Sequence, residues 1–185
     1  MRLDEFMLLT LLHIDEKMIA GRTLLQKTLY FLNETLQLGF EFTPHYYGPY
    51  SSKITETVEG LKSSGIVAEK IDKFPVFNFS VEYEPKKYTY KLTKIGKEIA
   101  EHIEKERPEE AIRIKNELSL MKQFGVARDY KNLSIAAKMY HILKRENKLM
   151  TTYEIMEEGK VLDWDIGEKE AQKALTFLKG MKLAS

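Results

Sequence analysis

The spacing of apolar residues changes along the first 106 residues, and this change restricts the folds that they can adopt. Apolar residues crowd positions 6–14 and then recur every three or four positions over 22–38, which predicts two helices with buried faces. Between residues 77 and 83 apolar and polar residues alternate, as they do in a half-buried strand. Residues 1–106 are therefore expected to combine helices with a small amount of β-structure.

Glycine and proline separate these segments. Gly21 precedes the second helix, and we expect Gly39 to end it. The aromatic loop, defined here as residues 42–51, contains two prolines and a glycine and cannot continue a helix. The order of elements up to this point is helix, helix, loop.

A third helix, a hairpin and a closing helix are predicted next. Ser51 or Ser52 can cap the third helix. Its buried face is predicted to comprise Ile54, Val58 and Leu61. Ile66-Val67 begins a short strand, and the alternating residues Phe77, Phe79, Val81 and Tyr83 are expected to pair with 88–92 through a turn at Pro85-Lys86. Thr93 should cap the closing helix, with Ile95, Ile99 and Ile103 turned inward and an end before Pro108. Three helices, a hairpin and a closing helix form the order of a winged helix-turn-helix domain at residues 1–106, with the hairpin as its wing.

Residues 107–185 are predicted to form a helical linker and a second, wingless helix-turn-helix-like unit. A linker helix is expected through Ile112, Leu118 and Met121. Three further helices are expected. The first is indicated by the shared face of Leu133, Ala136, Ala137 and Tyr140. The second begins at a capping box formed by Thr151 and Glu154 and stops at Gly159, and the third begins at a cap formed by Asp165 and Glu168. Because this order repeats that of the first unit, the helical parts of 1–106 and 130–185 are expected to superimpose. The predicted fold class is mainly α with a small β-hairpin wing.

Composition excludes several classes of protein. The 185 residues include no cysteine, which rules out disulfides, thiolate-bound zinc, iron–sulfur clusters and a thiol nucleophile. No apolar run reaches the roughly 18–20 residues of a membrane span, and residues 1–5 are too acidic for a signal peptide, so we expect a cytoplasmic protein. The abundance of Lys and Glu is typical of proteins from hot environments.

Little in the sequence indicates catalysis. His13, His45, His102 and His141 lie far apart, and no glycine-rich phosphate loop follows a strand. Asp163 and Asp165, with Glu157 and Glu158, could be interpreted as a metal site or an acid–base pair. We favour helix capping by Asp165 and a core position for Trp164. The sequence thus predicts neither an enzyme nor a metal or cofactor site.

Two stretches resemble known families. Residues 88–99 (Tyr-Thr-Tyr-Lys-Leu-Thr-Lys-Ile-Gly-Lys-Glu-Ile) resemble the last wing strand and following helix of PadR- and MarR-like regulators. Residues 25–31 (Leu-Gln-Lys-Thr-Leu-Tyr-Phe), together with Tyr47-Gly48-Pro49, resemble Panacea domains, the SocA-antitoxin-like group, and residues 44–51 are similar to uncharacterised YwgA-like proteins. The first resemblance implies a winged helix, and the second implies an antitoxin or adapter that acts through protein contacts. The helical unit after residue 108 departs from the Panacea pattern.

Two functional hypotheses follow. The first is a dimeric winged-helix DNA-binding transcriptional regulator, with Ser52, Lys53, Thr57, Lys86 and Lys87 as the DNA contacts. The second is a protein-interaction module of the antitoxin or adapter type, with Gln26, Lys27, Tyr46, Tyr47 and Tyr50 as the partner contacts. The architecture favours the first, whereas 29 basic against 28 acidic residues favours the second.

Each of these assignments has a simpler alternative. The three tyrosines can instead pack the loop onto the second helix, and we favour that interpretation. For Gln26 and Lys27 we favour a solvated edge or a hydrogen bond that tethers the loop. A homodimer is expected because the helices at 112–121 and 133–143 carry more apolar residues than a small peripheral unit needs.

Overall fold

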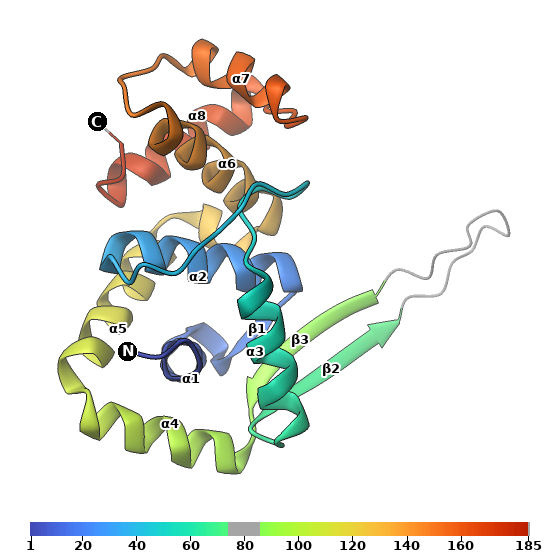
Figure 1. The fold of residues 1–185 in the computed structure, drawn as a ribbon, viewed down its shortest axis with the longest axis vertical. Coiled ribbons are helices and arrows are strands. Elements are labelled where there is room, and N and C mark those ends of the chain that lie inside the picture. The colour runs from blue at the N-terminus through green and yellow to red at the C-terminus, as the bar shows by residue number, and fades with distance from the viewer. Residues whose placement is uncertain (74–85, 185) are drawn as a thin grey trace, which may run out of the picture.

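A computed structural model describes residues 1–73 and 86–184. The protein is mainly helical, with a small three-stranded antiparallel sheet (Figure 1). The α-helices are α1 (Leu3–His13), α2 (Arg22–Leu36), α3 (Ser52–Ser63), α4 (Lys94–Glu106), α5 (Pro108–Gln123), α6 (Tyr130–Glu146), α7 (Thr152–Val161) and α8 (Glu168–Gly180). The strands are β1 (Met18–Ala20), β2 (Val67–Lys73) and β3 (Lys86–Leu92), and short 3-10 turns lie at Asp15–Lys17 and Gly125–Arg128.

Helix α1 is the central element of the N-terminal part. Every residue from Phe6 to Leu12 is buried, because α3, α4 and α5 pack around this helix. A helix that is apolar on all sides can only be stable inside the core. The dense apolar run at the start of the sequence is thereby accounted for.

Helix α2 begins after Gly21 as predicted but ends earlier than expected. Its C-cap is Gln37, which adopts the left-handed conformation at a φ of 56°, so Gly39 lies beyond the helix end. The backbone N–H groups of Gln37 and Leu38 bond back to the last turn, which satisfies its carbonyls. The prediction that Gly39 stops the helix was therefore wrong.

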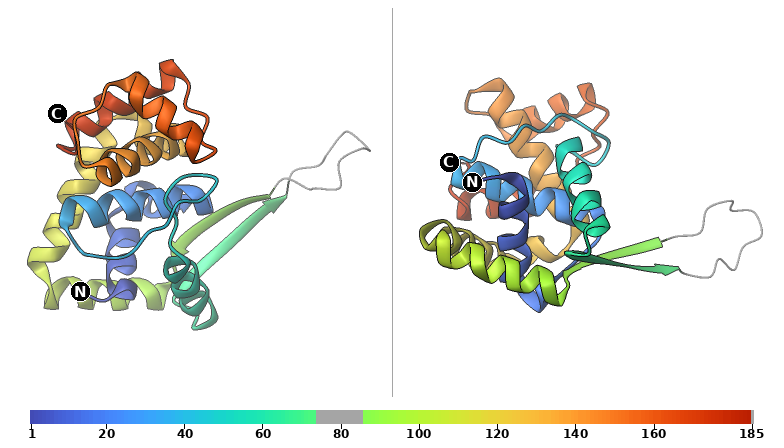
Figure 2. Two further views of the ribbon diagram at one scale, coloured as in Figure 1. Left: turned by 45° about the horizontal axis from the view of Figure 1, so that its top comes forward. Right: turned by 60° about the horizontal axis from the view of Figure 1, so that its bottom comes forward.

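The sheet differs from the predicted hairpin. Strand β3 pairs with β2, with Val67 opposite Leu92 and Lys73 opposite Lys86, and also with β1, so the order is β1-β3-β2. The expected pairing of 77–83 with 88–92 was therefore wrong, and 77–83 itself lies outside the described residues. Strand β1 was missed, because three residues are too few to show an alternating pattern. Figures 1 and 2 show strands β2 and β3 extending away from the helices.

The cap predicted for α4 is present. The Thr93 hydroxyl accepts a hydrogen bond from the Gly96 N–H at 3.0 Å and donates to the Gly65 carbonyl. Gly96, Ala100 and Ile103 face the core, whereas Ile95 is 60% exposed and its predicted inward position was wrong. The third residue of α4, at position 96, must be glycine, because a Cβ there would lie 2.0 Å from the Ile66 carbonyl oxygen.

The C-terminal part contains helices α6, α7 and α8 in the predicted order. The Thr151–Glu154 capping box is confirmed at α7. Gly159 lies inside α7, and α8 is preceded by Gly167 without a side-chain cap, so the stop at Gly159 and the cap at Asp165 were wrong. The division of the chain at residue 107 and the internal repeat stay predictions.

The core is continuous between the two parts. Helix α6 packs against α2 as well as against α7 and α8, and one cluster of buried apolar residues runs from Phe6 to Met181. Most of the apolar residues of α5 and α6 that suggested a homodimer are buried within this cluster; they are Ile114, Leu118, Met121, Leu133, Ala136, Ala137, Met139 and Ile142. These buried residues do not by themselves call for a second chain, whereas Ile112 on α5 is 57% exposed. Among the described residues, no helix has the combined length and apolar composition that crossing a membrane requires.

Replacing Gly96 with Ala is expected to lower the free energy of unfolding by about 1–3 kcal/mol, because the added methyl group must displace a backbone carbonyl. The matched control is Gly60→Ala in α3, where a Cβ would meet nothing within 4 Å. That change should raise the free energy of unfolding by about 0.5–1 kcal/mol. Urea unfolding of both variants checks this contrast, and equal effects would contradict it.

Candidate functional site

The aromatic loop runs between α2 and α3 and forms a compact turn. Thr43 and Tyr50 exchange two backbone hydrogen bonds of 2.9 Å each, and the Gly48 N–H donates to the His45 carbonyl at 2.8 Å. Gly48 has a φ of 89°, which favours glycine, and a Cβ at this position would lie 3.0 Å from Lys138 Cγ and 3.5 Å from Lys27 Cε. The loop backbone is thus folded tightly against α2 and α6.

Side chains of α2 hold the end of this loop that leads into α3. The Gln26 amide makes two hydrogen bonds with Ser51, donating to its carbonyl at 2.9 Å and accepting from its N–H at 3.0 Å. The Lys27 ammonium donates to the Pro49 carbonyl at 2.5 Å. Both side chains are buried, so the predicted tethering bond is confirmed and the alternative of a solvated edge was wrong.

The C-terminal part holds the other side of the loop. Ser134 on α6 donates its hydroxyl hydrogen to the Tyr47 carbonyl. Trp164, between α7 and α8, donates its indole N–H to the His45 carbonyl at 2.8 Å. We call these four side chains, Gln26, Lys27, Ser134 and Trp164, the loop clamp.

The side chains of the loop clamp donate hydrogen bonds to loop carbonyls, and two tyrosine side chains of the loop remain exposed to solvent. Tyr46 is 70% exposed and Tyr47 is 48% exposed, and their rings meet edge to face with centroids 4.8 Å apart. Tyr50 is half-buried and shares a 2.9 Å hydrogen bond with the Thr55 hydroxyl. The favoured interpretation, in which all three tyrosines pack the loop onto α2, was therefore wrong for Tyr46 and Tyr47.

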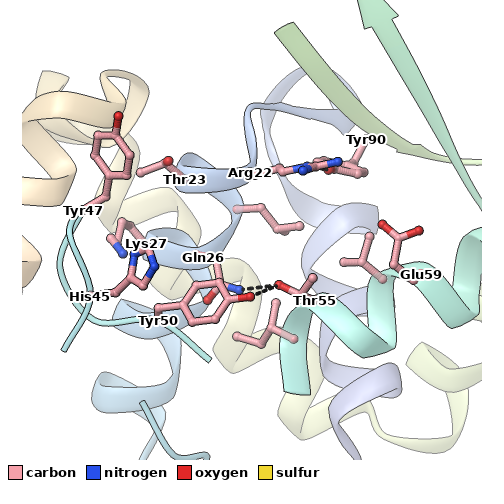
Figure 3. Close-up of a pocket in the computed structure, with 13 residues that line it drawn as sticks. Arg22, Thr23, Gln26, Lys27, His45, Tyr47, Tyr50, Thr55, Glu59 and Tyr90 are labelled. Carbon is pink, nitrogen blue, oxygen red and sulfur yellow. Dashed lines mark hydrogen bonds between the residues drawn. The ribbon is translucent and has the colours of Figure 1, made fainter. Parts of the chain in front are cut away.

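A pocket of about 260 Å³ lies beneath the loop (Figure 3). Its walls come from α2, α3, the aromatic loop and β3, and include His45, Tyr47, Tyr50, Tyr90, Leu25, Ile54 and Val58. Gln26 and Lys27 line it as well, with Arg22 and Glu59. The pocket therefore brings together the partner-binding candidates of the sequence except Tyr46.

Lys27 is the most strongly perturbed cation of this site. It is 2% exposed, and burial, together with the nearby Lys138 ammonium, lowers its pKa to about 7. Sequence reasoning placed Lys27 on the right helix but missed its burial. The signal that was available is its spacing from Tyr30 and Phe31, which lie three and four residues later and therefore share its side of the helix.

The predicted DNA contacts do not form one surface. Ser52 and Lys53 on α3 are exposed, but Thr57 is half-buried and donates its hydroxyl hydrogen to the Lys53 carbonyl. The side of α3 opposite its buried residues carries Ser52, Glu56, Glu59 and Ser63. The centre of the exposed face of α3 is therefore acidic.

The hairpin strands carry most of the positive charge near α3. Strands β2 and β3 hold five lysines, at positions 70, 73, 86, 87 and 91, against Glu69 and Asp72. Lys87 is exposed and lies opposite Asp72, on the sheet face that also carries Lys91. That face is turned away from Tyr90, which packs toward α2, so Lys87 and Ser52 do not share a surface. Lys86 pairs with Lys73 at the start of β3.

The remaining candidates for chemistry are accounted for by structural contacts. The His13 Nε2 atom lies 3.0 Å from the Glu104 carboxylate, and His102 forms an ion pair of the same kind with Glu106. The His141 ring packs edge to face against Trp164. Trp164 is fully buried, as predicted. Within residues 1–73 and 86–184, no group of three or more acidic or histidine side chains is placed to hold a metal ion.

The pKa of Lys27 predicts how stability changes with pH. Unfolded protein keeps a proton on this side chain up to the ordinary pKa, whereas the folded protein releases it near pH 7. The penalty for burying the charge is thus complete below about pH 7 and is relieved as pH rises. Compared with Lys27→Met, the native protein should gain up to about 1.4 kcal/mol of unfolding free energy per pH unit above about pH 7.

Urea unfolding at several pH values measures this difference. Lys53→Met, at an exposed position on α3, is the control and should show no such slope relative to the native protein. A difference between native protein and Lys27→Met that does not change between about pH 7 and about pH 9 would contradict a buried, titrating Lys27.

No protein-family model matches this sequence, and no curated protein shows significant similarity to it.

Proposed function

We propose that this protein is a protein-interaction module of the adapter or antitoxin kind, which contacts its partner through the aromatic loop. The observation that carries the proposal is the loop clamp together with the exposure of Tyr46 and Tyr47. Two neighbouring tyrosines that face solvent on a fixed backbone provide area and hydrogen-bonding tips at a low cost in conformational entropy.

The clamp favours binding because it orders the loop before a partner arrives. A loose loop loses conformational freedom on association, which weakens affinity. Here four buried side chains from α2, α6 and the α7–α8 connection already hold it. The binding energy of the tyrosines is then available for the partner, as at interface hot spots that are rich in tyrosine.

The scaffold that supports this proposal is a winged helix. We infer this arrangement from the order α1, β1, α2, α3, β2, β3 and from the extended β2–β3 hairpin next to α3 (Figure 1). A winged-helix scaffold serves both DNA-binding and protein-binding proteins, so the surface must decide the function. Its acidic α3 face favours a protein partner over the phosphate backbone of DNA.

DNA binding is the second candidate, and the lysines of the hairpin favour it. Lys70, Lys87 and Lys91 are exposed, so the wing could contact phosphates while α3 stays outside the groove. Such binding would be governed by charge rather than by base contacts. The homodimer expected of a regulator stays a prediction.

Partner binding is expected to depend on the two exposed tyrosines. The double variant Tyr46→Ala, Tyr47→Ala should capture at least about tenfold less partner than the native protein. Truncation of an interface hot spot weakens the binding free energy by about 2 kcal/mol or more. Tyr153→Ala, which removes a ring with the same 70% exposure on α7, should bind like the native protein. Affinity capture from cells of the source organism, quantified by mass spectrometry, compares the three proteins. Equal capture by all of them would contradict a role for the loop.

If DNA is bound, its affinity should follow the hairpin charges. The logarithm of the binding constant should fall with the logarithm of salt concentration at a slope of about −2 to −4, and Lys87→Ala with Lys91→Ala should reduce that slope by about two. Glu56→Gln should strengthen binding severalfold, whereas Glu109→Gln on α5 should have no effect. Fluorescence anisotropy on genomic fragments measures these values, and an absence of binding at low salt would exclude the DNA candidate.

A further inference from the structure

We propose that a cavity beside strand β1 is a binding site for a nucleoside monophosphate, with Lys122 and Arg128 among the groups that hold its phosphate. The β1 cavity has a volume of about 540 Å³ and is lined by the α1–β1 turn, β1, α2, β3, α5 and the turn at Gly125–Arg128. It shares no lining residue with the pocket beneath the aromatic loop. The proposal therefore goes beyond the partner-binding function and does not depend on it.

The first observation is the excess of positive charge at the mouth of the β1 cavity. The charged lining residues are all exposed, and they comprise four cations and two carboxylates: Lys17, Lys87, Lys122, Arg128, Asp15 and Glu16. Burial lowers the pKa of His13, which also lines the cavity, so this ring adds no charge at neutral pH. The excess of two positive charges matches a phosphate monoester, whose charge is about −1.5 to −2 near pH 7.

The second observation is that an anion already occupies two of these cations. The Asp15 carboxylate accepts a hydrogen bond from the Lys122 ammonium at 3.0 Å and another from the Arg128 guanidinium, and these contacts lower its pKa. One carboxylate balances only one of the two cations. Lys87 makes no ion pair with any residue in the described parts of the chain. Ammonium and guanidinium groups carry several N–H donors, so donors remain for phosphate oxygens.

The third observation is a pair of hydroxyl groups inside the cavity that have no partner. Thr28 on α2 is only 3% exposed and lines the cavity, yet its hydroxyl makes no hydrogen bond to another described residue. The hydroxyl of Thr89 on β3 lines the same cavity and is also unbonded within the described residues. Because buried polar groups are normally hydrogen-bonded, these hydroxyls are suited to polar atoms of a ligand.

The walls around these hydroxyls are mainly apolar. Ile19, Leu118 and Met121 are buried and line the cavity, and Met121 can adapt its shape to a bound ring. A wholly apolar ligand would leave the two hydroxyls unpaired, whereas a sugar phosphate would leave the apolar walls without contacts. A nucleoside has apolar ring faces as well as polar edges, so it meets both requirements. The volume of about 540 Å³ also lies within the roughly 300–1,000 Å³ of ligand pockets.

The test titrates the full chain with AMP, GMP, CMP and UMP in turn, followed by two-dimensional NMR. At least one nucleotide should shift the amide signals of Ile19, Thr28, Thr89 and Lys122. The same nucleoside without its phosphate should bind at least about tenfold more weakly, because it cannot use the charges at the mouth. Inorganic phosphate should shift the Lys122 amide and leave the Thr28 amide in place, because it has no body to enter the cavity.

Three charge variants at exposed positions separate the site from general electrostatic attraction. Lys122→Gln should weaken binding of that nucleotide by at least about fivefold. Asp15→Asn should strengthen it severalfold, because Asp15 competes with the phosphate for Lys122 and Arg128. Lys105→Gln, at an exposed position of α4 outside the cavity, is the matched control and should bind like the native protein.

Thr28→Val tests the interior of the β1 cavity without changing its charge. It removes a hydroxyl that the folded protein leaves unpaired, so the variant should resist urea at least as well as the native protein while it binds the nucleotide more weakly. The proposal is overturned if no nucleotide shifts the cavity amides at millimolar concentration, if nucleoside and nucleotide bind equally, or if Lys122→Gln binds like Lys105→Gln. These readouts involve neither a partner protein nor DNA, so their failure is distinct from failure of partner capture.

Discussion

The double hydrogen bond between Gln26 and Ser51 is the interaction on which the arrangement of the aromatic loop depends. It joins the middle of α2 to the residue that precedes α3, and it satisfies a buried backbone N–H and C=O that water cannot reach. Lys27, one residue later, holds the Pro49 carbonyl in the same way. Without these two side chains the segment between the helices would carry unpaired buried polar groups.

The same loop also joins the two halves of the molecule. Ser134 and Trp164 belong to the C-terminal part, and both donate to loop carbonyls. A loop in the N-terminal part of the chain is therefore held in place partly by the helices that follow it. This explains why the helices after residue 108, which depart from the Panacea-like pattern, matter for the arrangement of the tyrosines and of the pocket.

Charge is distributed so that neighbouring surfaces differ in what they attract. The exposed face of α3 is acidic at Glu56 and Glu59, whereas the hairpin strands are rich in lysine. A near-neutral net charge for the whole chain conceals these differences. Surface position, rather than composition, therefore decides which ligand each region suits.

Local features of this fold could be predicted from the sequence because they depend on neighbours along the chain. The cap at Thr93, the capping box at Thr151 and the buried face of α3 are examples, since each involves residues within one or two helical turns. The partner of β3, the burial of Lys27 and the exposure of Tyr46 depend on contacts between distant segments. The alternating side chains of residues 77–83 suggested that this segment pairs with 88–92. The observed partner of β3 is β2, and the backbone hydrogen bonds between these strands leave no such pattern in the sequence. Gln26 and Lys27 could be singled out from the sequence, but their roles depend on the packing of the loop between α2 and α6. This packing places Gln26 against the Ser51 backbone and buries the Lys27 ammonium beside the Pro49 carbonyl. Burial decides both roles, because it removes the water that would otherwise solvate these side chains.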